Sequence, residues 1–342
     1  MTKLLIIGFD GMDYFITKRT IREYTFKNFN PIFKKQLTIE TLTGPSWASL
    51  YTGLNKEIHG VIDEWGRDID GGNCFKDIEH YLFWNVIQKE GYKVYEDNLP
   101  ITPNGFPFNS NEKKDVANWV AQNWEKMIRK IGFEETLSKI KEDSFKIINE
   151  RELKNRDLIF IQFSFLDRIG HIYTFKNDEI MKQSYFLAYE LIDKIYKLTR
   201  PQYLIVTSDH GFWKHRVHHL HANCAVLILN NNAYQFFKKN RYFKRFSISQ
   251  ILNPEYLIEH YDSLLGLGYS VLSSLSFFEK FQYIFHFDYV RQTDIFDAIL
   301  KMFDIDYEKP KARIPKKKIR KETIKEDEEA IKERLRRLGY LS

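Results

Sequence analysis

The chain has 342 residues, of which 43% are hydrophobic and 16% aromatic, so it can bury a large core and is not a mainly disordered protein. Its two cysteines, Cys74 and Cys224, are too few and too isolated for a disulfide framework or a thiolate zinc site. Twelve Lys and Arg against six Asp and Glu fall in residues 311–342, so this segment carries the whole net charge of +6. The rest of the chain is neutral overall and lacks the basic bias of a nucleic-acid-binding domain.

No apolar stretch is long enough to span a membrane. The N-terminal apolar run Leu4–Phe9 is too short for the core of a signal peptide and ends directly at Asp10. We therefore expect a cytoplasmic protein. Nothing in the sequence indicates its oligomeric state.

Short apolar runs bounded by turn residues alternate with longer helical patterns, and this alternation is typical of α/β proteins. Strands are expected at 3–10, 157–165, 203–209 and 225–230. Helical patterns lie between them near 112–131, 135–154 and 178–199. Because the expected strands are apolar on both faces, we predict a central, mostly parallel sheet that is covered by helices on both faces.

The C-terminal part of the chain departs from this alternation. An aromatic-rich stretch, 255–290, is expected to form a helical insertion or cap over the core. Prolines and a charge run make 309–321 linker-like, and the sequence after it shows one apolar helical face up to a stop at Gly339. We predict one domain over 1–308, followed by a basic linker and an amphipathic helix over 309–342. The basic run supports nucleic-acid contact only weakly, since charge runs beside helices are more often solvated surface.

Three aspartates lie at or just past the carboxyl ends of expected strands. They are Asp10, Asp167 and Asp209. Ligands bind at this edge in open α/β sheets, and three acids on one edge are the geometry of a metal site. Each acid alone is more simply read as a helix cap.

The segment TLTGPSWASLYTG (41–53) predicts a helix, with Pro45 in its first turn and Gly53 at its end. Thr43 would then lie at or beside the N-cap. The free N–H groups and the positive dipole end of a helix favour an anion such as phosphate at that position. An ordinary N-cap threonine is the alternative.

Histidines accompany two of the aspartates. In LDRIGH, Asp167 and His171 are spaced i, i+4, so both can face one ion, and in SDHG, Asp209 and His210 are adjacent. The run from 208 to 223 holds five of the ten histidines of the chain. A histidine-rich surface loop is the alternative to a metal site there.

In this order, the four segments resemble the type I phosphodiesterase/nucleotide pyrophosphatase branch of the alkaline phosphatase superfamily. The matching stretches are IIGFDGMD, TGPSWASLYTGLNKEIHG, FLDRIGH and TSDHGF, within roughly residues 1–230. The resemblance implies an alkaline-phosphatase-like fold, so 1–308 is the expected catalytic domain.

The resemblance also implies two divalent metal ions, most often zinc, with manganese or iron as alternatives. The residues implied for the first ion are Asp10, Asp209 and His210, with the Thr43 oxygen beside it. Those implied for the second are Asp167, His171 and one further histidine. HANCAVLILN (221–230) fits the family's frame for this last ligand. His221 is therefore the first choice, and His219, two residues earlier on an extended chain, is the second.

A threonine hydroxyl is a poor nucleophile at neutral pH, and a divalent metal lowers the barrier to its deprotonation. The resemblance implies that Thr43 attacks phosphorus in a small-molecule phosphodiester or pyrophosphate, and that water releases the resulting phospho-threonine. Glu64 and His219 are the candidate substrate contacts. Glu64 stands where nucleotide pyrophosphatases have an asparagine that holds a phosphate oxygen, which puts nucleotide diesters in doubt. Asp13 stands where an arginine is frequent.

Three alternatives stay open. The chain could be a phosphomonoesterase or a sulfatase-like hydrolase of the same superfamily, although the arginine of the sulfatase signature is missing after Thr43. It could also be a non-catalytic metal-binding relative, but loss of the nucleophile or of a ligand would then be expected, and neither is seen.

Overall fold

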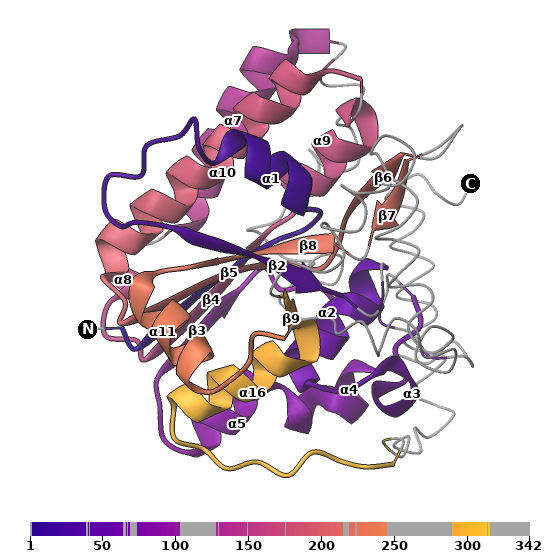
Figure 1. Cartoon of the computed structure of the whole chain (residues 1–342), viewed down its shortest axis with the longest axis vertical. Helices are drawn as coiled ribbons and strands as arrows, with labels where there is room; N and C mark the ends of the chain where they lie inside the picture. Colours follow the sequence, from indigo (N-terminus) through magenta and orange to yellow (C-terminus); the bar gives the residue numbers. More distant parts are fainter. Residues whose placement is uncertain are drawn as a thin grey trace.

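A computed structural model describes residues 2–102, 128–244 and 289–314, and all statements on structure concern these residues. Within these ranges, the structure does not describe positions 39, 41, 64–65, 67, 69–73, 129, 149, 175, 215–218, 223 and 313. The described part is built around a seven-stranded sheet with the order β3-β4-β1-β5-β8-β2-β9 (Figure 1). Its strands are β1 Leu4–Phe9, β2 Ile32–Leu37, β3 Val94–Asp97, β4 Leu158–Phe163, β5 Tyr203–Ser208, β8 Cys224–Leu229 and β9 Tyr289–Arg291.

Six of the seven strands run in one direction. β1 pairs in parallel with β4 and β5, β3 with β4, and β9 with β2. β8 is antiparallel to both of its neighbours, β5 and β2. The carboxyl ends of the six parallel strands therefore meet at one edge of the sheet. A separate two-stranded ribbon, β6 Gly211–Lys214 and β7 His219–Ala222, lies beyond that edge (Figure 1).

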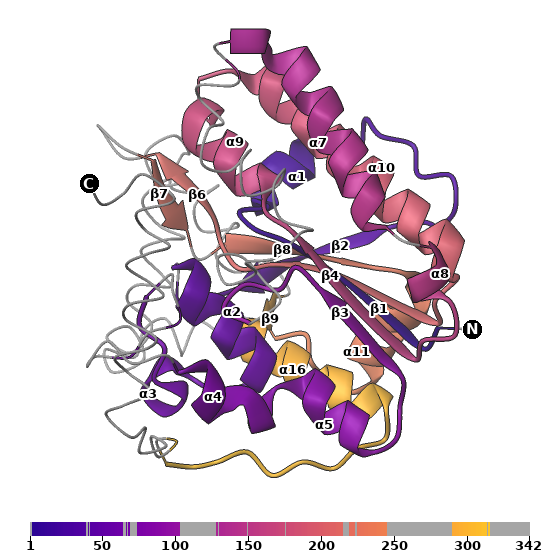
Figure 2. The ribbon, with the colours of Figure 1, turned by 180° about the vertical axis from the view of Figure 1, so that it is seen from behind.

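Helices cover both faces of the sheet, as the view from behind in Figure 2 also shows. The helices on one face are α1 Tyr14–Thr20, α7 Phe133–Ile147, α8 Glu150–Leu153, α9 Phe165–Tyr173 and α10 Asp178–Thr199. Those on the other are α2 Thr43–Thr52, α3 Lys56–His59, α4 Phe75–Ile78, the 3-10 turn η1 Glu79–Tyr81, α5 Phe83–Lys89, α11 Asn231–Lys239 and α16 Gln292–Met302.

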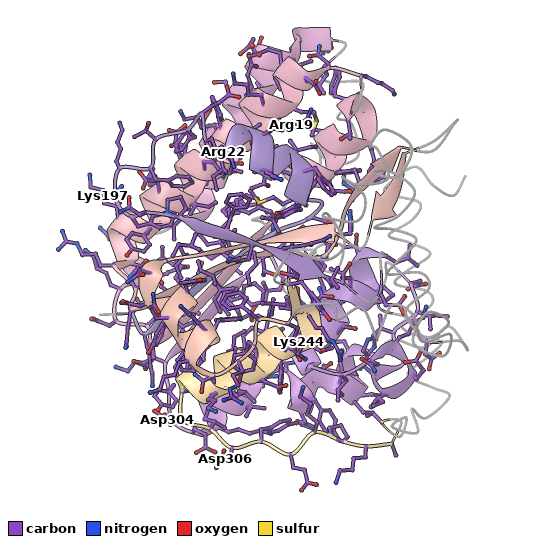
Figure 3. All side chains as sticks on the ribbon, in the orientation of Figure 1. Arg19, Arg22, Lys197, Lys244, Asp304 and Asp306 are labelled. Carbon is purple, nitrogen blue, oxygen red and sulfur yellow. The ribbon has the colours of Figure 1, made fainter. Side chains whose placement is uncertain are left out.

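The strand sequences explain this layered arrangement. Along β1, Leu4 and Ile6 pack into the core on the α2 side, whereas Leu5, Ile7 and Phe9 pack into the core on the α10 side. Successive side chains of a strand point to opposite faces, so a run that is apolar at every position needs a cover on both. The side chains fill both layers, and charged groups such as those labelled in Figure 3 lie at the periphery.

The prediction of a mostly parallel sheet with helices on both faces is confirmed. The four expected strands begin and end within about two residues of β1, β4, β5 and β8, and α10 spans the expected 178–199. The expected helix at 135–154 is divided into α7 and α8. None of the helices in the described ranges has the length and apolar character needed to cross a membrane.

The predicted division into 1–308 and 309–342 stays a prediction, because most of its evidence lies outside the described residues. Of the expected insertion 255–290, the structure describes only its last two residues, which begin β9. Of the C-terminal segment it describes 309–312 and Ile314. Ile314 is buried in the core on the α2 side, and its N–H donates to the carbonyl of Ile58 at 3.0 Å.

Candidate active site

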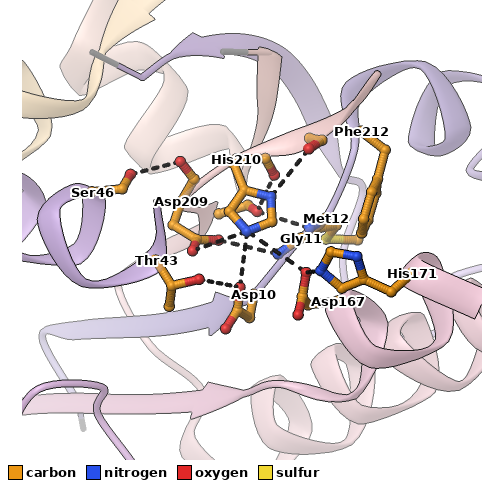
Figure 4. A network of polar contacts seen from close by, with 12 residues as sticks. Asp10, Gly11, Met12, Thr43, Ser46, Asp167, His171, Asp209, His210 and Phe212 are labelled. Atoms are coloured by element: carbon orange, nitrogen blue, oxygen red, sulfur yellow. Dashed lines mark hydrogen bonds and ion pairs between the residues drawn. The ribbon is translucent and has the colours of Figure 1, made fainter. Parts of the chain in front are cut away.

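The polar residues expected at strand ends meet at the carboxyl edge of the sheet. Asp10 follows β1, Asp167 lies in the first turn of α9 after β4, and Asp209 follows β5. Thr43 is the first residue of α2, which follows β2. The close view in Figure 4 shows the four side chains converging with two histidines. Parallel strand direction brings these segments together from across the chain.

Asp10, Asp209 and His210 form the first part of this cluster. The distance from His210 Nε2 is 3.2 Å to Asp10 Oδ1 and 3.5 Å to Asp209 Oδ2. One potential ligand atom from each residue lies within 4.8 Å of the other two, and all three side chains are buried. This group could hold a metal ion.

Asp167 and His171 extend the cluster toward solvent. His171 Nε2 lies 3.2 Å from Asp167 Oδ1, and the same oxygen lies 3.7 Å from His210 Nε2. The Asp167 side chain is buried, whereas 43% of the His171 side chain is exposed. The two parts of the cluster are therefore continuous, and the His171 part is the more open one.

Thr43 joins the cluster through its hydroxyl. Thr43 Oγ1 donates to Asp10 Oδ1 at 3.4 Å. The residue before it, Leu42, occupies the N-cap and supplies no side-chain hydrogen bond to the helix. The first N–H groups of an α-helix lack partners within the helix, so this hydroxyl lies beside backbone donors and the positive end of the helix dipole.

The cluster combines three carboxylates with two imidazoles. Burial by itself lowers the pKa of His210, but Asp209, Asp10 and Asp167 together raise it to about 10. Burial, and then the charge of Asp10, raises the pKa of Asp209 well above its usual range. The hydrogen bond to Asp167 raises the pKa of His171. In each case the surroundings favour the protonated form of the group, which is neutral for Asp209 and positively charged for the two histidines.

These residues fit a divalent metal. Asp209 Oδ2 is buried and accepts no hydrogen bond within the described part of the chain. A buried carboxylate is costly unless it is paired or coordinates a metal. His210 Nδ1 lies 3.1 Å from the carbonyl oxygen of Gly211, which can only accept, so Nδ1 carries a proton and donates there. Nε2 is therefore the nitrogen that faces the carboxylates, and it could bind a metal ion in exchange for its own proton. Oxygen and imidazole donors suit zinc, manganese and iron.

Hydrogen bonds from neighbouring segments hold the ligands in place. The N–H of Gly11 donates to Asp209 Oδ1 at 3.1 Å, and Ser46 Oγ donates to the Asp209 carbonyl at 2.6 Å. Ser208 Oγ donates to the His210 carbonyl at 3.0 Å and accepts from the N–H of Met12 at 2.8 Å. The sequence analysis missed Ser46 and Ser208. Both lie within motif segments, but their hydrogen-bond partners are visible only in the fold.

The histidine run enters this region through the ribbon. In the β6–β7 ladder, His221 is opposite Phe212, and His219 is opposite Lys214. Position 221 is therefore nearer to the cluster than position 219, because Phe212 directly follows the segment 209–211. Glu64, His215 and His218 lie outside the described residues.

Several solved structures resemble this chain at low identity. Human ectonucleotide pyrophosphatase/phosphodiesterase 5 is 14% identical, with a TM-score of 0.45 over 91% of this chain and 97% of its own. The murine protein of the same name is 21% identical, with a TM-score of 0.38 over 62% of this chain and 57% of its own. Phosphonoacetate hydrolase from Sinorhizobium meliloti 1021 is 15% identical, with a TM-score of 0.42 over 63% and 58%.

The chain thus spans somewhat more than half the length of the last two structures. A search of curated proteins finds no match. The model of the family described as type I phosphodiesterase / nucleotide pyrophosphatase matches residues 4–243, which include Asp10, Thr43, Asp167, Asp209 and His210. Because this match covers most of the sequence and confirms the resemblance, the chain belongs to the type I phosphodiesterase/nucleotide pyrophosphatase family.

Proposed function

We propose that the chain is a metal-dependent hydrolase of phosphodiester or pyrophosphate bonds in small-molecule phosphate esters, with Thr43 as the nucleophile. One observation carries the proposal: the Thr43 hydroxyl lies at a helix N-terminus and 3.4 Å from an oxygen of a buried Asp/Asp/His group that could hold a metal ion. This arrangement supports the proposal because it combines a hydroxyl that could act as the nucleophile, carboxylate and imidazole groups that could bind a cation, and backbone N–H groups suited to an anion.

The proposed centre holds two divalent ions, with zinc as the first choice. The ligands of one are Asp10, Asp209 and His210, with Thr43 beside them. The ligands of the other are Asp167, His171 and His221, which the ladder position opposite Phe212 favours over His219. When bound, the ions supply Lewis-acid stabilisation of the charges that develop at phosphorus and at the attacking oxygen.

The protein's own groups then perform an in-line displacement. Thr43 Oγ1 loses its proton to solvent water and forms a bond to phosphorus. The bond from phosphorus to the leaving oxygen on the opposite side breaks at the same time, and the leaving group departs with the electron pair. The backbone N–H groups at the start of α2 bind the non-bridging oxygens. A water molecule then cleaves the bond between phosphorus and Thr43 Oγ1, which restores the hydroxyl and releases the phosphorylated product.

The test compares bis(p-nitrophenyl) phosphate, p-nitrophenyl phosphate and p-nitrophenyl sulfate on chelator-treated protein, with zinc or manganese restored. We expect metal-dependent turnover, fastest for the diester, and a loss of at least about 1,000-fold in Thr43→Ala, because removing the nucleophile leaves only the contribution of substrate binding. Thr199→Ala is the matched control. Thr199 lies at the far end of α10, where its hydroxyl donates to the Ile195 carbonyl.

The outcomes separate the alternatives. Faster monoester or sulfate turnover would keep the site but move the protein to the phosphatases or to the sulfatase-like enzymes. Bound metal without turnover of any substrate would favour a non-catalytic metal-binding protein. Full activity in Thr43→Ala would contradict the proposed nucleophile.

A further inference from the structure

The aromatic ring of Phe212 contacts both histidines of the candidate centre. Its centroid is 5.6 Å from that of His171 and 5.9 Å from that of His210, with interplanar angles of 90° and 87° (Figure 4). Both contacts are edge-to-face, which is a preferred geometry for aromatic pairs. The Phe212 and His210 side chains are buried, whereas that of His171 is partly exposed, so the ring lies on the inner side of the His171 imidazole.

The same ring packs against two glycines in the segments that carry the aspartates. A Cβ atom added at Gly11 would come within 3.1 Å of the Phe212 ring and 2.8 Å of the Asp167 Cα. A Cβ atom added at Gly170 would overlap the ring directly. The ring therefore occupies the space that side chains at these two positions would need.

A buried carboxylate anchors the backbone of Phe212. The Phe212 N–H donates to Asp13 Oδ2 at 3.1 Å, while Asp13 Oδ1 accepts from the N–H groups of Phe15 and Ile16 and caps α1. The hydroxyl of Tyr185 on α10 in turn accepts from the Asp13 N–H at 2.7 Å. The start of β6 is thus fixed to two helices on one face of the sheet.

We propose that Phe212 is a positioning residue of the proposed metal centre, whose ring holds the imidazoles of His171 and His210 in a fixed mutual placement. The ring contacts a histidine from each proposed ligand set, so it sets the relation between the two halves of the centre. The inference rests on the proposed function in one respect, namely that these histidines bind metal. It adds a residue that carries no ligand atom.

The first test measures zinc affinity by chelator competition in Phe212→Leu, with Phe237→Leu as the matched control. Phe237 is buried in α11, away from the carboxyl edge of the sheet. Loss of a group that orients metal ligands typically lowers metal affinity about 10- to 100-fold, and we expect a loss of at least about 10-fold in Phe212→Leu. The control should stay within about twofold of the wild type.

A second readout separates positioning from a general loss of stability. Zinc raises the thermal unfolding midpoint of any protein that binds it only when folded. Both leucine variants should lower the midpoint of the metal-free protein, but only Phe212→Leu should reduce the increase caused by zinc. Equal increases in both variants would overturn the proposal.

Gly170→Ala supplies a third variant, because its methyl group displaces the ring without removing it. We expect Gly170→Ala alone to weaken zinc binding, and the double variant with Phe212→Leu to bind no more weakly than Phe212→Leu alone. If the losses of zinc affinity in the two single variants add up in the double variant, the two substitutions do not both act through the Phe212 ring.

Two results on the wild-type protein distinguish the two proposals. If the wild type binds no zinc, manganese or iron, the proposed function fails, and the proposed positioning role of Phe212 fails with it. Tight metal binding without hydrolysis would overturn the proposed function only.

Discussion

Asp13 supports three backbone N–H groups with one carboxylate, two at the start of α1 and one at the start of β6. Burial raises its pKa, although the three hydrogen bonds act in the opposite direction. The family resemblance leads one to expect an arginine at this position, where this chain has Asp13. In the structure, the buried Asp13 side chain links the start of α1 to the start of β6 in the ribbon.

We predict that Asp13→Ala lowers the free energy of unfolding by about 2–4 kcal/mol, because it removes an N-cap and leaves a buried N–H of Phe212 without its acceptor. Asn177→Ala is the matched control, since the Asn177 side chain caps α10 with a single bond to the N–H of Ile180. Its expected cost is about 1 kcal/mol. Urea unfolding measures both, and equal losses would show that the bond to Phe212 contributes nothing.

His59 is a buried histidine outside the metal cluster. Its Nδ1 accepts the N–H of Val61 at 3.1 Å, so Nε2 carries the proton that it donates to Ser49 Oγ, also at 3.1 Å. Burial, and secondarily the charge of Lys56, lowers the pKa of His59 to about 3. The folded protein therefore keeps this imidazole neutral where an unfolded chain would protonate it.

This shift makes stability depend on pH in a predictable direction. Between an unfolded pKa of about 6.5 and the folded value, the unfolded chain binds more protons, so the contribution of His59 is complete above pH 6.5 and is lost as the pH falls. We expect up to about 1.4 kcal/mol of this loss per pH unit. Urea unfolding of the wild type and of His59→Gln at pH 7 and pH 5 measures this loss. If the free energy of unfolding falls by the same amount in both proteins, His59 does not cause the pH dependence.

The residues of the site differ in how far sequence alone could identify them. Asp10, Asp167 and Asp209 could be identified because each follows an apolar strand, and parallel strands end at one edge. Phe212 could not, because a phenylalanine after Asp-His-Gly looks like any strand residue. Its contacts with His171 depend on how α9 and β6 approach each other in the fold.

At the scale of elements, α2 ends at Gly53, where both the backbone conformation and the packing against a neighbouring helix require a glycine. Gly53 caps it in the left-handed conformation, with a φ of 66°. A Cβ atom there would lie 2.6 Å from Cδ1 of Phe296 on α16, so the close packing of these two helices also requires a glycine. The direction of α2, and with it the position of Thr43, depends on this contact.

We predict that Gly53→Ala lowers the free energy of unfolding by about 3 kcal/mol, from backbone strain and from overpacking against Phe296. Gly91→Ala is the matched control, because Gly91 has a φ of 87° but no atom within 4 Å of an added Cβ. It should cost only about 1–2 kcal/mol, the backbone part alone. A similar loss in both variants, measured by urea unfolding, would remove the packing argument.

The strands that the sequence analysis missed are short or carry mixed patterns. β2 reads IFKKQL, with two central lysines, although Lys35 is buried in the sheet. β3, β6, β7 and β9 have three or four residues each, too few for a period to be recognised.

At the scale of the whole molecule, α/β class and layering followed from the apolar runs, but strand order did not. The position of Thr43 at the site depends on β2, whose pairing with β8 links residues almost 200 positions apart, as in Leu37 with Cys224. Such long-range pairing leaves no local signal. The packing of Ile314 against the core likewise lies beyond the expected boundary at 308, because a single apolar residue in a basic run gives no pattern.

The reversed direction of β8 has a consequence for how members of such a family can diverge. β5 ends and β8 begins at the same edge of the sheet, and the described residues between them include the two strands β6 and β7, which pair with each other outside the main sheet. The ribbon formed by β6 and β7 lies beyond this edge (Figure 1). Changes in its length or composition at positions other than Phe212 and His221 can therefore accumulate without disturbing the sheet. We therefore expect differences in substrate specificity among members of the family to arise in this ribbon, while the sheet stays unchanged.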